Sequence, residues 1–160
     1  MNNTKTIMSI DPGIHNCGYC FMTENQKLIS YGLINSKENK WYDNCKHVWF
    51  KLYENYTKQF PKTVYIEYPT HHAGMMAFAA RESGALAKLT FLCGGIYSLL
   101  SEIATVELIT PSQWKGQLKK EMVRKRLYNI YPEISKLDLD HNIVDAIGIG
   151  YYTLEAKNVL

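Results

Sequence analysis

Short apolar segments follow one another along this chain of 160 residues in an order that few folds allow. The first segment ends at Asp11-Pro12-Gly13, a turn signal. Three segments with strand character come first, and helical patterns then alternate with two more. The five segments are residues 6–10, 17–23, 28–35, 63–68 and 106–109. This order predicts one α/β domain, residues 1–160, with a mixed sheet and helices on its faces.

Helical periodicity occupies the intervening segments. Apolar residues recur at spacings of three and four from Trp41 to Phe60, and Pro61 ends that pattern. The alanine-rich segment from Met75 to Ile103 predicts one or two buried helices, with Gly94-Gly95 allowing close packing. A basic helix is expected over residues 121–131 and a last helix over about 142–156.

Charge is distributed unevenly along the chain. The formal net charge is only +3, but the segment 115–126 holds six basic residues and one acid, a net charge of +5. Such a patch favours phosphate as a partner, although a basic helix face is also common on solvated surfaces. The six basic residues are Lys115, Lys119, Lys120, Arg124, Lys125 and Arg126.

Three acids stand at the ends of, or inside, apolar segments: Asp11, Glu67 and Asp145. Each has an ordinary alternative. Asp11 would be a turn residue, Glu67 would face solvent on an edge strand, and Asp145 would hydrogen-bond within helix packing. Buried carboxylates need partners, and hard divalent cations prefer carboxylate oxygen. Together the three acids favour a site for two Mg²⁺ ions that promote phosphoryl displacement.

The motifs that carry these acids resemble the RuvC-type Holliday junction resolvases across nearly the whole chain. The matching segments are Ser9-Ile10-Asp11-Pro12-Gly13-Ile14-His15-Asn16-Cys17-Gly18-Tyr19, Ile66-Glu67 and Val144-Asp145-Ala146-Ile147-Gly148-Ile149. The resemblance, to a phage or otherwise divergent member, implies an RNase H-like fold with a five-stranded mixed sheet flanked by helices. It also implies a homodimer that nicks paired strands at four-way or branched DNA junctions with Mg²⁺, for which Mn²⁺ substitutes.

One position departs from that family's pattern. The bacterial members carry a fourth acid three residues before the last aspartate, where this chain has Asn142. His141 would share the helix face of Asp145 and is a candidate metal ligand or proton carrier. Asp140 is a second candidate for the catalytic set. The alternative makes Asp140 a helix N-cap and His141 a solvated residue of the first turn.

The remaining predictions concern DNA. Lys119 or Lys120 would stabilise charge near the scissile phosphate. Tyr68 and Phe78 are candidate wedges that stack on unpaired bases, or else core residues, and Arg81 would contact a phosphate.

Other functions are less well supported by the sequence. A zinc site at Cys17 and Cys20 is disfavoured because residues three apart on a strand face opposite sides, so buried thiols are expected. With no apolar leader pattern, a cytoplasmic protein is expected. Loss of the fourth acid keeps open a non-catalytic junction-binding protein. An actin-like ATPase is disfavoured by the short chain.

Overall fold

A computed structural model describes residues 5–70 and 83–158 of the chain. The strands are β1 (Thr6–Asp11), β2 (Asn16–Thr23), β3 (Leu28–Asn35), β4 (Thr63–Glu67) and β5 (Thr105–Ile109). The helices are α1 (Trp41–Gln59), α3 (Ala85–Ser101), α4 (Pro111–Trp114), α5 (Lys120–Ile130), α6 (Pro132–Ser135) and α7 (His141–Asn158).

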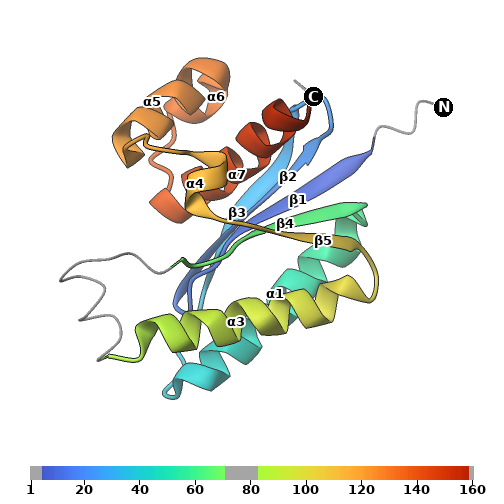
Figure 1. Cartoon of the computed structure of the whole chain (residues 1–160), viewed down its shortest axis with the longest axis vertical. Helices are drawn as coiled ribbons and strands as arrows, with labels where there is room; N and C mark the ends of the chain where they lie inside the picture. The colour runs from blue at the N-terminus through green and yellow to red at the C-terminus, as the bar shows by residue number, and fades with distance from the viewer. Residues whose placement is uncertain (1–4, 71–82, 159–160) are drawn as a thin grey trace.

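The five strands form one sheet in the order β3-β2-β1-β4-β5 (Figure 1). The first three strands are an antiparallel meander, and β4 and β5 then add parallel to β1. The parallel strands β1 and β4 lie at the centre of the sheet, so their carboxyl ends meet at the same edge. This is the mixed sheet that the segment order predicts.

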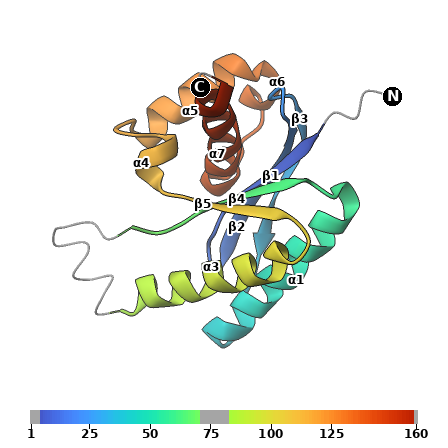
Figure 2. The same ribbon diagram turned by 45° about the vertical axis from the view of Figure 1, so that its right-hand side comes forward.

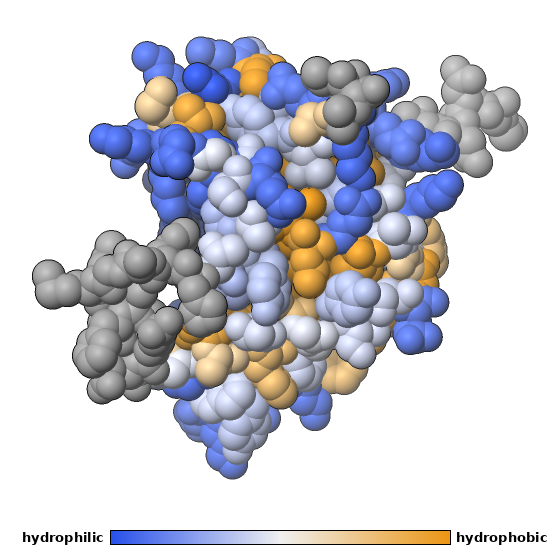
Figure 3. All heavy atoms as spheres, viewed as in Figure 1, coloured by the Kyte–Doolittle hydropathy of each residue, from blue (hydrophilic) through white to orange (hydrophobic). Residues whose placement is uncertain are grey.

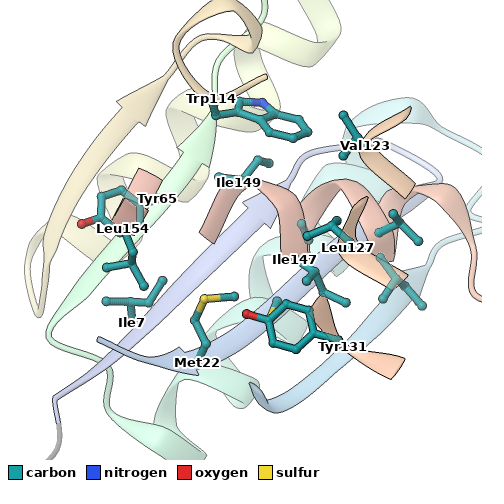
Figure 4. Packing of buried hydrophobic residues seen from close by; sticks show 14 of the residues in the cluster. Ile7, Met22, Tyr65, Trp114, Val123, Leu127, Tyr131, Ile147, Ile149 and Leu154 are labelled. Carbon is teal, nitrogen blue, oxygen red and sulfur yellow. The ribbon is translucent and has the colours of Figure 1, made fainter. Parts of the chain in front are cut away.

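Helices cover both faces of the sheet (Figure 2). Helices α1 and α3 pack together on one face, over a core that includes Met8, Ile10 and Phe21. Helix α7 crosses the other face, with α4, α5 and α6 beside it (Figure 1). Figure 4 shows the core of this second layer, where Ile147 and Ile149 of α7 lie among side chains from the sheet and from α5.

The predicted elements agree with the observed ones to within a few residues at their ends. Helix α1 ends at Gln59, and its C-cap Phe60 has a left-handed φ of 45° immediately before Pro61. The first part of the predicted 75–103 helical segment lies outside the described residues. Its second part is α3, which is not buried throughout, because Phe91 and Tyr97 are exposed.

The two neighbouring glycines of α3 behave differently. A Cβ on Gly95 would collide with the Trp49 ring of α1, so the expected close packing occurs there. A Cβ on Gly94 would meet nothing within 4 Å. Within the single chain, the predicted close packing therefore occurs at Gly95 and not at Gly94, which faces outward.

Polar and apolar surfaces are unevenly spread. In Figure 3, hydrophilic atoms predominate over α5 and α6 at the top of the view, and hydrophobic atoms gather near the middle, close to β5. Leu108 of β5 and the nearby Ile103 are among the exposed apolar side chains.

Within the described part of the chain, no helix combines the length and apolar character needed to cross a membrane.

Candidate active site

Asp11 and Glu67 end the two central strands at the same edge of the sheet. Ile10 of β1 pairs with Ile66 of parallel β4, and the two acids are the next residues of their strands. Successive side chains of a strand point to opposite faces of the sheet, and Ile10 and Ile66 belong to the core on the α1 and α3 side. Both carboxylates therefore lie on the α7 side. The alternative that Glu67 faces solvent on an edge strand is excluded, since β4 lies between β1 and β5.

Helix α7 brings Asp145 to these two acids. Its first turn lies directly against β2, where a Cβ on Gly18 would collide with the carbonyl oxygen of Asn142. Gly18 is the β2 partner of Asp11 in the sheet register. In addition, the buried Ser9 hydroxyl of β1 donates a hydrogen bond of 2.7 Å to the Ala146 carbonyl, next to Asp145. These contacts fix the third acid above the ends of β1 and β4.

Asp11 and Asp145 are buried, Glu67 is half-buried, and the three carboxylates repel one another. Asp11 is 9% exposed and Asp145 is 6% exposed. Burial raises the pKa of Asp11 well above its usual value, and the charges of Glu67 and Asp145 raise it further. Burial also raises the pKa of Glu67, against the lowering effect of a hydrogen bond from Trp114. Among the described residues, the Asp11 carboxylate has no hydrogen-bond or ion-pair partner.

The other two carboxylates have protein partners. The Trp114 indole nitrogen donates a hydrogen bond of 2.6 Å to Oε2 of Glu67. The Lys120 ammonium lies 3.3 Å from Oδ2 of Asp145. Lys115 is also close enough to the acids for its charge to lower the pKa of both Asp11 and Glu67.

The donor set suits a hard cation in its chemistry, because three mutually repelling carboxylates need positive charge between them. The side chains are not already arranged around an ion. Across residues 5–70 and 83–158, no three His, Cys, Asp or Glu side chains form a group that could hold a metal as they stand. Lys120 and Trp114 hold two of the acids instead, so a cation would have to compete with Lys120 for Asp145.

The candidates for a fourth site residue surround the start of α7. Oδ1 of Asp140 accepts hydrogen bonds from the backbone N–H and the side-chain amide of Asn142, at 2.8 and 2.9 Å. This is the helix N-cap geometry of the alternative. Nδ1 of His141 lies 3.5 Å from the same oxygen, on an exposed side chain. His141 nevertheless lines a pocket of about 230 Å³ together with Asp145 and Lys120.

Only two of the six basic residues line the pocket beside Asp145. Lys120 and Arg124, one turn apart on α5, line the pocket beside Asp145, and Lys115 lies over the Trp114 ring at 4.7 Å. Arg124 also donates a hydrogen bond to the Leu139 carbonyl, which ties α5 to the segment before α7. Lys119, Lys125 and Arg126 are exposed elsewhere on or next to α5.

The predicted DNA-stacking residues are only partly described. Tyr68 is half-buried and packs against the core beneath α1 and α3. Phe78 and Arg81 lie outside the described residues. The four cysteines are free and buried, as expected. Cys17 and Cys20 belong to the cores on opposite faces of the sheet, which does not suit a shared zinc ion.

Comparison with known proteins gives the family. No protein-family model matches the sequence. The crossover junction endodeoxyribonuclease RuvC of Aliarcobacter butzleri (strain RM4018) is 30% identical over an alignment of 161 positions, which covers 90% of this chain and 94% of that protein. The chain belongs to the RuvC family. This confirms the resemblance seen in the acidic motifs.

Solved structures agree on the RuvC fold. Thermus thermophilus RuvC in complex with a Holliday junction substrate matches with a TM-score of 0.75 at 16% identity, over 96% of each chain. The yeast mitochondrial Holliday junction resolvase Ydc2 matches with a TM-score of 0.62 at 14% identity, over 96% of this chain and 82% of that one. The fowlpox virus resolvase, also solved with junction DNA, matches at 0.56 and 17% identity, over 95% and 98%. The predicted RNase H-like fold is confirmed.

Sequence reasoning missed three residues that shape the RuvC-like site: Ser9, Gly18 and Trp114. Ser9 and Gly18 lie within the opening motif, but their contacts are with α7, 137 positions further along in the case of Ser9. Trp114 lies in a mostly polar segment between β5 and α5, where Leu118 is the other large apolar residue, and this sparse apolar pattern was the available signal.

Proposed function

We propose that this protein is a divalent-cation-dependent DNA endonuclease that resolves four-way or related branched DNA junctions by paired nicks. The observation that carries the proposal is the convergence of Asp11, Glu67 and Asp145 at one edge of the sheet, beside Lys115 and Lys120. Family membership supports the nuclease chemistry. The junction DNA in two of the similar structures supports the branched substrate.

Asp11, Glu67 and Asp145 would hold the cation, Mg²⁺ or Mn²⁺, as one or two ions. When bound, the cation supplies activation of the attacking water and stabilisation of the leaving 3′ oxygen. His141 is our first choice for a fourth ligand or proton carrier, because it lines the same pocket as Asp145. Asp140 is the second choice, acting from its position as the cap of α7.

The lysines of the site have two tasks in this proposal. Acids and DNA phosphates repel one another, so positive charge is needed at the border of the site. Lys120 is 60% exposed on a long stem, so its ammonium would be free to bind the scissile phosphate when Asp145 holds the cation instead. Lys115 stays closer to the acids, over the Trp114 ring.

The DNA-binding surface would extend outward from the site. Exposed lysine and arginine side chains beyond the pocket would neutralise phosphates on the arms of the junction, and such contacts add no sequence preference. The residues we assign to this surface are Lys119, Lys125 and Arg126, with Arg124 at the pocket, and Arg81, Tyr68 and Phe78 from the sequence prediction.

The free thiols support a reducing, cytoplasmic setting.

A second copy of the chain is the partner that paired nicks require. The exposed stripe of α3 carries no charged side chain, although it faces outward along the whole helix. At its centre, Gly94 leaves open space where another helix can approach. The stripe consists of Ala87, Thr90, Phe91, Gly94, Tyr97, Ser98 and Ser101. We propose this α3 stripe as the homodimer interface.

A cleavage assay tests the function. Labelled four-way junction, linear duplex and single strand are each incubated with the protein in Mg²⁺, in Mn²⁺ or in chelator. We expect symmetric nicks with 5′-phosphate ends on the junction, dependent on the cation, and little cleavage of the linear substrates. Cleavage that persists in chelator, or equal cleavage of duplex, would contradict the proposal.

A junction-binding protein without nuclease activity is the second candidate. It is favoured by Asn142 at the fourth position, whose amide is bound to Asp140, and by the engagement of Asp145 by Lys120. Tight junction binding without nicks in either Mg²⁺ or Mn²⁺ would support it.

A further inference from the structure

The indole of Trp114 connects the elements that carry the acids. Its nitrogen donates the 2.6 Å hydrogen bond to Glu67 at the end of β4. Its ring packs on α7, where a Cβ on Gly148 would come within 2.7 Å of the ring atom Cζ3. Gly148 lies one turn after Asp145. Figure 4 shows the Trp114 ring beside Ile149 of α7, at the end of the core nearest α4. One side chain therefore contacts both β4 and α7.

The short helix α4 holds Trp114 in a fixed place. The sheet register pairs Glu67 with Ile109, the last residue of β5, so α4 begins beside Glu67. Thr110 and Gln113 form a reciprocal capping box, and Pro111 occupies the first turn. Trp114 itself is 4% exposed. A side chain so confined has few alternative rotamers, so its N–H keeps one direction.

The hydrogen bond distinguishes the two oxygens of Glu67. An indole N–H is a donor only, so it occupies Oε2 and cannot itself compete as a ligand. Oε1 has no hydrogen-bond partner among the described residues. Groups that fix the orientation of a ligating carboxylate commonly contribute 10–100-fold, roughly, to metal affinity.

We propose that Trp114 is a positioning residue for Glu67, because its hydrogen bond fixes the carboxylate so that Oε1 faces the cation. Since the same ring packs on α7, it also links the orientation of Glu67 to the position of the helix that carries Asp145. The inference rests on the proposed function, because it assumes that Glu67 binds the cation. It adds a residue that the acidic motifs do not include.

The direct test measures Mn²⁺ binding to metal-free protein by calorimetry and by electron paramagnetic resonance. Trp114→Phe keeps an aromatic ring but removes the N–H, and we expect affinity to fall by roughly 10–100-fold. Binding of junction DNA in chelator should stay within about two-fold, because Trp114 is buried. Trp49→Phe is the matched control. Its half-buried indole also donates to an acceptor, the Leu92 carbonyl at 3.0 Å, but on the opposite face of the sheet.

A spectroscopic arm keeps native Trp114. The chain has three tryptophans, so the double variant Trp41→Phe/Trp49→Phe leaves Trp114 as the only one. We expect Mg²⁺ to change its fluorescence with the same midpoint as binding, and Glu67→Ala to abolish this change. This arm remains informative if Trp114→Phe fails to fold.

The outcomes separate the two proposals. Unchanged Mn²⁺ affinity in Trp114→Phe, or an equal loss in Trp49→Phe, overturns the positioning role while the function stands. If Mg²⁺ binds but the fluorescence of Trp114 does not change, the positioning role of Trp114 is overturned as well. Wild-type protein that binds no Mn²⁺ contradicts the proposed function and this inference together.

Discussion

Asp11 is the residue at which stability and function oppose each other most clearly. Its carboxylate is 9% exposed, lies beside two other acids, and has no hydrogen-bond or ion-pair partner among the described residues. Desolvating a carboxylate in this way costs free energy unless positive charge is supplied. In our proposal, a bound divalent cation supplies this positive charge.

Replacing Asp11 by Asn should stabilise the metal-free protein at neutral pH. The pKa of Asp11 is higher in the folded than in the unfolded chain, so wild-type stability falls as pH rises through the range between those two values. Asn at this position removes that loss. We expect metal-free D11N to melt higher than wild type at pH 7 by a few degrees, on the order of 2–4 °C.

Melting temperatures measured from pH 3 to pH 8 in chelator test this expectation. The two proteins should converge at low pH, where Asp11 is protonated in the wild type, and Mg²⁺ should raise only the wild-type value. Asp138→Asn, at an exposed acid, is the control. Parallel curves for wild type and D11N would contradict the account.

At the scale of elements, the site depends on how closely α7 approaches the sheet. Gly18 removes the side chain that would collide with α7, and Ser9 holds the neighbouring carbonyl of the helix. Both residues act on Asp145 without belonging to the acidic cluster. The position of the third acid is therefore a property of β1 and β2 as much as of α7.

Gly18→Ala should lower both stability and activity. The added methyl meets backbone at Asn142, which cannot move without shifting the first turn of α7. We expect a loss of roughly 1–3 kcal/mol in the free energy of unfolding, measured by urea denaturation. Cleavage should fall further than the folded fraction does. A variant with wild-type stability and turnover would show that α7 does not depend on this contact.

The basic residues of α5 make a separate prediction about DNA affinity. Lys119 and Lys125 are exposed, and neither is among the charges that shift the pKa of Asp11 or Glu67, so they should bind phosphates without taking part in the chemistry. Replacing both by alanine should reduce the slope of log affinity against log salt by about one to two. Filter binding of the junction in chelator measures this slope. An unchanged slope would place the DNA on another surface.

Much of this arrangement could be predicted from the sequence, because its signals are local. Short apolar segments and turn signals mark the strands that end at Asp11 and Glu67, and helical spacing marks α1. The contacts of Ser9, Gly18 and Trp114 could not be predicted, because each depends on an element that is distant in sequence or weakly patterned. Composition likewise did not show that the basic segment divides between the pocket and other surfaces.

At the scale of the whole molecule, the two faces of the sheet have different tasks in our account. The α7 side carries the acids and the basic border. The opposite side presents the uncharged α3 stripe, which we assign to a second copy of the chain. Two sites held in one dimer would allow nicks in opposing strands of a junction.

Gly94→Glu should convert the dimer to a monomer. The fold should survive, because a Cβ at Gly94 meets nothing within 4 Å in the single chain. A charge at the centre of an uncharged helix contact is costly to bury. Sedimentation equilibrium should therefore give the single-chain mass of 18.5 kDa for the variant and twice that mass for wild type. Lys27→Glu, at an exposed turn, is the control. A dimeric variant would contradict the assigned interface.

We propose that Asp11, Glu67 and Asp145 together hold the cation with which the protein cleaves branched DNA. The most direct measurement is single-turnover cleavage of a labelled four-way junction in Mg²⁺ by Asp11→Asn, Glu67→Gln and Asp145→Asn, with Glu133→Gln on the exposed surface of α6 as control. We predict that each of the three variants binds the junction in chelator as wild type does but loses cleavage, while the control cleaves normally. Wild-type cleavage rates in any of the three would contradict the claim.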